Sequence, residues 1–136
     1  MVEFIIWSDS YSTGIHDIDA QHIKIVRIIN DLFVANQKDG LQGIELKKRL
    51  LLIKIYTETH FQYEETLMRY SQFPEYKEHR KYHLEMIQKT NEMIKEFYNS
   101  NQQQSEVLFQ FLKKWWIEHI QDKDELYVPY LKKLGL

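Results

Sequence analysis

The 136-residue chain has no cysteine, which excludes disulfide bonds, thiolate metal sites and cysteine redox chemistry. Only two prolines and four glycines are present, and this scarcity favours long helices over a turn-rich β fold. Neither charge sign dominates, because the formal net charge is -2. Nucleic-acid binding needs a clustered positive patch, and the short basic runs at 47–49 and 132–133 fit solvated helix faces. We therefore expect no nucleic-acid partner.

Long apolar segments are also missing. No apolar run approaches the roughly 20 residues that a membrane-spanning helix requires, so we expect no membrane span. Residues 1–9 carry an early acid and lack a cationic stretch followed by a long apolar one, unlike a signal peptide. We therefore expect a cytoplasmic protein. The apolar and charged fractions, 43% and 28%, are ordinary for a globular domain, and we expect one domain over 1–136.

Apolar residues recur at steps of three and four, which is the period of helices with one buried face. This pattern predicts bundle helices at about 18–38, 44–71, 75–98 and 105–121, after an irregular arm at 1–17 and before a short helix at 125–134. Asp17 or Asp19 is the expected N-cap of the first helix. Gly40, Gly43 and Pro74 mark breaks between helices. Short connections imply an all-α, up-down-up-down antiparallel four-helix bundle.

Several of the predicted apolar stripes carry metal-ligand residues where leucine or isoleucine would be expected. A buried histidine or carboxylate must be satisfied, or it costs several kcal/mol. Four segments each contribute at least one such group, and they can satisfy one another through a shared centre. The candidates are His22, His60 and Glu64, His79 and His83, and His119, with Asp124 five residues later.

Spacing supports this interpretation, because residues four apart lie on the same helix face. His79 and His83 can hold one ion together, whereas Glu64 can reach a second ion beside His60. The five-residue step to Asp124 needs a turn or helix end after His119. Each pair alone is weak evidence, but seven ligand-type groups suit two ions with bridging carboxylates. Imidazole and carboxylate suit several first-row transition metals. We assign no role to His16, which is expected in the arm.

With these residues in this order, the chain resembles the hemerythrin and myohemerythrin family of non-haem di-iron oxygen-binding proteins, and within it the bacterial hemerythrins. The resemblance covers essentially the whole chain and fills all seven ligand positions of the family. It rests on Trp7 in the arm, Ile18-Asp19-x-Gln21-His22, His60-Phe61-x-x-Glu64-Glu65, His79-x-x-x-His83, and Trp115-x-x-x-His119-Ile120 ahead of Asp124.

The resemblance implies two iron ions joined by a solvent-derived oxo or hydroxo bridge. It implies that His79, His83 and His119 bind one iron and that His22 and His60 bind the other. Glu64 and Asp124 would bridge both ions, and dioxygen would bind at an open position on the second iron.

The expected residues of the O2 pocket lie one turn from the ligands or next to them: Ile25, Phe61, Trp115, Trp116 and Ile120. None of these side chains is an acid that could donate a proton, so cleavage of the O–O bond and loss of peroxide should be slow. Trp116 departs from the family, which usually has leucine three residues before the last histidine. Its larger ring would narrow access to the pocket, slow O2 exchange or turn outward.

The implied function is reversible O2 binding for storage, delivery or supply, without catalytic turnover. Two alternatives remain open: an oxygen or redox sensing module, and handling of peroxide, nitric oxide or iron by the same centre. Five histidines with two carboxylates point away from carboxylate-rich oxygenase chemistry without excluding it. We expect a monomer, because a closed bundle should leave no apolar stripe exposed.

Overall fold

The computed structural model describes residues 4–39, 44–99 and 103–136, except for the side chains of 38–39, 103–105 and 122–124. Its long helices are α1 (His16–Asp39), α2 (Ile44–Tyr70), α3 (Tyr76–Tyr98) and α4 (Gln103–Glu118). Its shorter elements are the 3-10 turn η1 (Asp9–Tyr11), the π-helical turn η2 (His119–Lys123), the 3-10 turn η3 (Asp124–Leu126) and α5 (Val128–Lys132).

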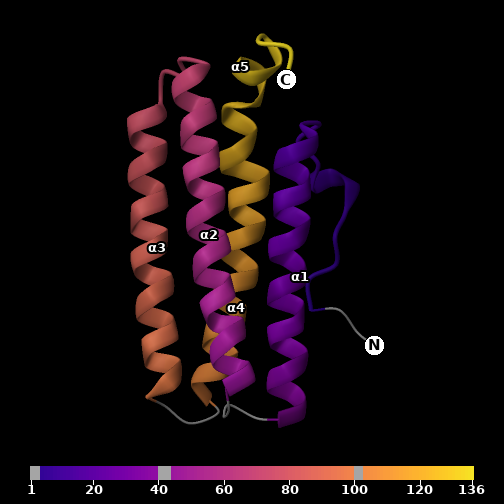
Figure 1. The fold of residues 1–136 in the computed structure, drawn as a ribbon, viewed down its shortest axis with the longest axis vertical. Helices are drawn as coiled ribbons and strands as arrows, with labels where there is room; N and C mark the ends of the chain where they lie inside the picture. The colour runs from indigo at the N-terminus through magenta and orange to yellow at the C-terminus, as the bar shows by residue number, and fades with distance from the viewer. Residues whose placement is uncertain (1–3, 40–43, 100–102) are drawn as a thin grey trace.

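The long helices run alternately up and down, with α1 beside α2, α2 beside α3, and α3 beside α4 (Figure 1). The predicted all-α, up-down-up-down bundle is therefore confirmed. Short connections explain the topology, because they allow consecutive helices to pack only as antiparallel neighbours. Gly40 and Gly43, which we expected to end the first helix, lie outside the described residues. Among the described residues, no helix is both long enough and apolar enough to cross a bilayer.

The N-terminal arm lies along the outside of α1 (Figure 1). Its contact is specific, because Asn30 binds both backbone groups of Ile5. The Ile5 N–H donates to Asn30 Oδ1 at 2.8 Å, and Asn30 Nδ2 donates to the Ile5 carbonyl at 2.9 Å. The Ile5 side chain is 1% exposed and joins the bundle core. Burial of this side chain stabilises the folded state by about 1.5–3 kcal/mol.

The first helix begins at His16, not near residue 18. His16 is thus the first residue of α1 instead of an arm residue, and its side chain is exposed. The prediction of an aspartate N-cap was wrong. Asp19 lies in the first turn of α1, where its carboxylate accepts hydrogen bonds from the Thr13 N–H at 2.8 Å, the Thr13 hydroxyl at 2.8 Å and the Ser12 hydroxyl at 2.7 Å. Burial alone would raise the pKa of Asp19, but these hydrogen bonds lower it overall.

The end of α2 depends on a residue in the left-handed region. Gln72 has φ of 57°, and the Phe73 N–H donates to the Met68 carbonyl at 3.0 Å across the turn. This closing bond satisfies a carbonyl that the helix end leaves unpaired. The helix therefore ends at Tyr70, and the left-handed residue reverses the chain before Pro74 is reached.

The last bundle helix ends at Glu118 and not at 121, because the backbone widens into the π-helical turn η2 at His119. The C-terminal helix is also shorter than predicted, since 124–126 form a 3-10 turn and α5 covers only Val128–Lys132. Pro129 does not interrupt this helix. It occupies the first turn, where the missing N–H of proline has no helical partner to lose.

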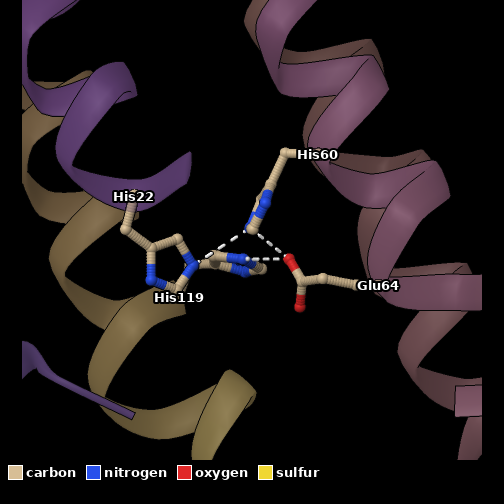
Figure 2. Close-up of side chains that lie close together, drawn as sticks. All are labelled: His22, His60, Glu64 and His119. Atoms are coloured by element: carbon tan, nitrogen blue, oxygen red, sulfur yellow. Dashed lines mark hydrogen bonds and ion pairs between the residues drawn. The ribbon is translucent and has the colours of Figure 1, made fainter. Parts of the chain in front are cut away.

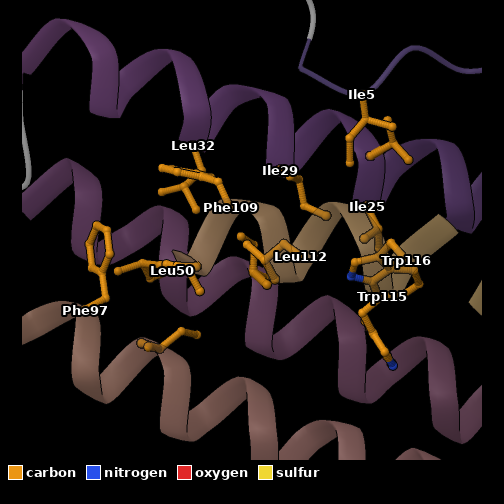
Figure 3. Close-up of a cluster of buried hydrophobic side chains, with 14 of the residues drawn as sticks. Ile5, Ile25, Ile29, Leu32, Leu50, Phe97, Phe109, Leu112, Trp115 and Trp116 are labelled. Atoms are coloured by element: carbon orange, nitrogen blue, oxygen red, sulfur yellow. The ribbon is translucent and has the colours of Figure 1, made fainter. Parts of the chain in front are cut away.

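Among the described side chains, two apolar clusters fill the interior. The larger contains residues from all four long helices and Ile5 of the arm, with leucine, isoleucine and aromatic side chains meeting between the helices (Figure 3). The smaller one is formed by Ile15, Ile18, Met68, Phe73, Tyr127, Val128 and Leu131.

The outer face of α2 is less covered than expected. Ile44, Leu51 and Ile55 there are 69%, 55% and 47% exposed, which removes the reason given for expecting a monomer.

Candidate metal centre

Six of the seven predicted ligand side chains are described, and all six are buried. They come from α1 (His22), α2 (His60 and Glu64), α3 (His79 and His83) and the first residue of η2 (His119). His79 is the most exposed of them, at 5%. The bundle therefore brings ligand-type groups from four segments into one interior region, as their positions on the apolar stripes predicted.

The first group contains His22, His60, Glu64 and His119, each of which offers a ligand atom within 4.8 Å of the others. The Nε2 atoms of His22 and His60 are 3.0 Å apart. His119 Nε2 lies 3.0 Å from Glu64 Oε1, and His60 Nε2 contacts the same oxygen. Figure 2 shows these side chains converging from three helical segments on one point. This convergence is the arrangement that a single ion requires.

The second group contains Glu64, His79 and His83. The two histidines lie on one face of α3, with ring centroids 4.6 Å apart. Glu64 belongs to both groups, and its carboxylate can therefore contribute to two ion positions. His119 is placed between the groups, since its ring lies 5.8 Å from that of His22 and 5.5 Å from that of His83.

The side chain of Asp124 lies outside the described residues. Its backbone begins η3, directly after the π-helical turn that starts at His119. We expected a turn or helix end between these two residues. The α-helix ends just before them, at Glu118, and the π-helical turn η2 covers the interval from His119 to Lys123. A π-turn joins residues five apart by backbone hydrogen bonds, and such turns are frequent at functional sites.

Two side chains that carry no ligand role hold ligand imidazoles from the outer side. The Nδ1 of His60 lies 2.6 Å from Gln21 Oε1, and the Nδ1 of His83 lies 3.1 Å from Glu65 Oε2. With Nδ1–H donating outward, each ring directs Nε2 toward the centre. Burial raises the pKa of Glu65, Arg80 opposes this rise, and neighbouring Glu64 adds to it.

Sequence reasoning did not identify Gln21 and Glu65 as functional, although both stand next to a ligand. Each residue supports a ligand on the neighbouring helix, since Gln21 of α1 contacts His60 of α2 and Glu65 of α2 contacts His83 of α3. Adjacency to a ligand and membership of the motifs behind the family resemblance were the available signals. Neither signal could show which imidazole each side chain would meet.

Aromatic rings enclose the histidines. Phe61 stacks on His83 with centroids 3.8 Å apart and planes 2° from parallel, and Trp115 stacks on His119 at 5.5 Å. Trp116 lies 5.2 Å from His119 and is 0% exposed, so the option of an outward-turned ring was wrong. Ile25 and Ile120 are buried as well. On the other side, the ring of Tyr127 lies 5.7 Å from that of His79.

This donor set fits a transition-metal centre. Five imidazoles and a carboxylate are gathered without a thiolate, and such ligands suit iron, zinc or copper. Placing so many polar groups in an apolar interior is costly unless they share partners. The two ligand groups joined by Glu64 suggest a site for two ions, with His22, His60, Glu64, His79, His83 and His119 as the residues that would hold them.

Comparison with known proteins agrees with this site. The family model described as the hemerythrin HHE cation binding domain matches residues 13–131. A bacteriohemerythrin of Pseudomonas aeruginosa is 32% identical over 128 residues, covering 94% of this chain and 82% of the relative. Bacteriohemerythrins of Stenotrophomonas maltophilia and Clostridium acetobutylicum are 29% and 27% identical over 128 and 131 residues. These alignments cover 94% and 90% of this chain, and 82% and 98% of the relatives.

Solved structures show the same fold. Wild-type hemerythrin superposes with a TM-score of 0.80 at 25% identity, covering 94% of this chain and 98% of the other. A hemerythrin mutant in which alanine replaces leucine gives a TM-score of 0.82 at 24% identity, covering 96% and 98%. The family match over nearly the whole chain, the bacterial relatives and the buried histidine and carboxylate groups lead to one conclusion: this chain belongs to the hemerythrin family and is a metal-binding four-helix bundle of the bacterial hemerythrin type.

Proposed function

We propose that this chain binds dioxygen reversibly at a di-iron centre, for O2 storage, delivery or supply rather than for catalytic turnover. The observation that carries the proposal is the position of Glu64, which belongs to both ligand groups. A carboxylate shared in this way can hold two ions side by side. Imidazole and carboxylate ligands by themselves suit several metals. Membership of the hemerythrin family supports iron among them.

The ligands of the proposed centre are His22, His60, Glu64, His79, His83, His119 and Asp124. Asp124 is included because the family has a carboxylate at this position, and because the π-turn after His119 supplies a backbone suited to the five-residue spacing. When bound, the iron pair supplies the reversible electron transfer to dioxygen that no side chain here can provide.

Charge supports a buried centre of this composition. Two ferrous ions carry four positive charges, and Glu64, Asp124 and a solvent-derived hydroxide carry three negative charges. The remaining charge is near +1, and a near-neutral cluster is far less costly to bury than two separate ions. The outward hydrogen bonds of Gln21 and Glu65 stabilise the orientation of His60 and His83 toward this charge.

The proposed O2 pocket is lined by Ile25, Phe61, Trp115, Trp116 and Ile120. All five are buried, with exposed fractions of 4% or less. These side chains exclude water, and none carries a group acidic enough to deliver a proton. A pocket lined in this way would withhold protons from a dioxygen molecule bound at the centre, which could then leave as it entered. This enclosure favours reversible binding over turnover.

The test is a gas-exchange experiment on the iron-loaded protein. The protein is reduced without air, O2 is admitted, and the visible spectrum is recorded before and after the gas is removed. We expect an absorption band that forms with O2 and disappears without it. A single irreversible conversion to the ferric state would contradict the proposal. Steady consumption of peroxide or nitric oxide would then favour detoxification, and a large change of shape on oxidation would favour sensing.

A further inference from the structure

A second polar feature lies outside the metal centre, on the surface between α2 and α3. It is a pocket of about 460 Å³ lined by Gln62, Glu65, Thr66, Arg69, Tyr76 and Arg80. The first four residues come from the last part of α2 and the other two from the first part of α3, close to the corner that joins these helices (Figure 1). Nothing in the proposed oxygen chemistry uses Gln62, Arg69 or Arg80.

The charges in this pocket are unbalanced. Two guanidinium groups, those of Arg69 and Arg80, face a single carboxylate, that of Glu65. Arg80 Nε lies 3.5 Å from Glu65 Oε1, and the other oxygen of Glu65 is 3.1 Å from His83 Nδ1. Glu65 thus divides its charge between a surface arginine and a buried histidine. The pocket retains net positive charge in a protein whose formal net charge is -2.

Arg69 is held in position but forms no ion pair of its own with a described side chain, although its charge, like that of Arg80, opposes the rise in the pKa of Glu65. Its guanidinium lies 5.9 Å from the ring of Tyr76, a cation–π distance that limits its movement. Among the described side chains, no carboxylate lies within ion-pair distance of Arg69. The planar fork of a guanidinium matches the paired oxygens of a carboxylate or phosphate. The amide of Gln62 adds a neutral donor on the same wall.

We propose that this pocket binds a small oxyanion, namely a phosphate or carboxylate group on a metabolite-sized molecule. Arg69 and Arg80 supply the charge-assisted hydrogen bonds. The pocket volume exceeds that of the anionic group alone and falls within the range of small-molecule sites, so it leaves room for an organic body.

The position of the pocket also connects it to the metal centre, and this part of the inference depends on the proposed function. An anion held by Arg80 competes with Glu65 for that guanidinium. Glu65 then accepts the His83 N–H more strongly, and a stronger acceptor makes the imidazole a better electron donor to a bound metal. Occupancy of the pocket therefore changes the electronic environment of His83 without any ligand entering the bundle.

The first experiment measures binding of inorganic phosphate and of succinate to the iron-loaded full chain by calorimetry at fixed ionic strength. We expect at least one of them to bind, and Arg69→Gln and Arg80→Gln each to weaken that binding about tenfold. Arg27→Gln removes the same charge from the exposed face of α1 and should leave the affinity unchanged. Failure of both anions to bind, or equal affinities in all variants, would overturn the site.

A second measurement separates this pocket from direct coordination of phosphate by iron. The visible spectrum should shift on anion binding in the unsubstituted protein and remain constant in the Arg69→Gln/Arg80→Gln double variant. A spectral shift that persists in the double variant would place the anion on the metal and refute the pocket. Calorimetry reports binding whether or not the protein takes up O2, so failure of the pocket can be distinguished from failure of the oxygen-binding proposal.

Discussion

His60 Nδ1 lies 2.6 Å from Oε1 of Gln21, so a side chain of α1 holds a ligand of α2 in place. Gln21→Leu keeps a similar size but removes the acceptor. We expect metal affinity to fall about 10- to 100-fold, the usual effect of losing an outer partner of a ligand histidine. Competition with a chelator measures this change. Gln88→Leu, on the exposed face of α3, is the matched control and should leave the affinity unaltered.

The shared position of Glu64 predicts a change in metal stoichiometry. Glu64→Gln replaces the shared carboxylate by a neutral amide, and the iron content should fall from two ions per chain toward one or none. Glu65→Gln is the same substitution one residue along, and it removes the charge behind His83 that also pairs with Arg80. That variant should keep both ions with affinity about tenfold lower. Elemental analysis that finds two tightly held ions in Glu64→Gln would refute the bridging role.

Replacement of the buried Trp116 should change the rate of gas exchange. Trp116→Leu opens space beside His60 and His119, whose rings lie 5.8 Å and 5.2 Å away. We expect O2 association and dissociation to accelerate severalfold, together with a loss of stability of about 1–3 kcal/mol from the cavity. Stopped-flow and flash-photolysis measurements test the rates. Trp7→Leu in the half-buried part of the arm is the control, and unchanged rates in Trp116→Leu would mean that this ring has no part in gating.

The carboxylate of Asp19 predicts a pH dependence of the docked arm. The folded-state pKa of Asp19 is lowered, because hydrogen bonds from Thr13 and Ser12 outweigh burial, which alone would raise it. Its contribution to stability is therefore fully present above its unfolded pKa of about 3.9 and is lost as the pH falls through the lower folded pKa. Asp19→Asn should cost about 1 kcal/mol near neutral pH.

Urea denaturation at a series of pH values tests this effect through the difference between the unsubstituted protein and Asp19→Asn. The difference in unfolding free energy should stay constant above about pH 5 and shrink toward zero in stronger acid. Acid release of metal affects both proteins and cancels in the difference. Asp31→Asn, on the exposed face of α1, should show no comparable trend. A difference independent of pH would contradict the assignment.

At the corner between α2 and α3, replacement of Gln72 by glycine should stabilise the folded protein. Gln72 has φ of 57°, a conformation that costs a side-chain-bearing residue about 1–2 kcal/mol and costs glycine little. Glycine also gives the unfolded chain more conformational entropy, which offsets part of this gain. Gln72→Gly should therefore raise the unfolding free energy by about 0.5–1 kcal/mol. Gln88→Gly, inside α3, should lower it by about 1 kcal/mol. Thermal denaturation that shows both variants destabilised equally would argue against strain at Gln72.

The helices and most of the ligand set followed from the sequence, because both depend on short-range periodicity. A histidine at a position where the 3.6-residue period requires a leucine must face the interior, whichever helix it will meet. His22, His60, His79, His83 and His119 could be recognised for this reason, and the scarcity of glycine and proline left few ways to break the helices. Short connections then permitted few topologies.

The tertiary structure alone decided which side chains would meet. Gln21 and Glu65 are ordinary polar residues in the sequence, and only the packing of α1 on α2 and of α2 on α3 brings them to His60 and His83. The inward position of Trp116 was likewise decided by the packing of the helices around it. The physical reason is that periodicity determines which face of a helix is buried. The contacts across that face depend on the rotation and depth of two helices at once, and no local pattern in one helix contains that information.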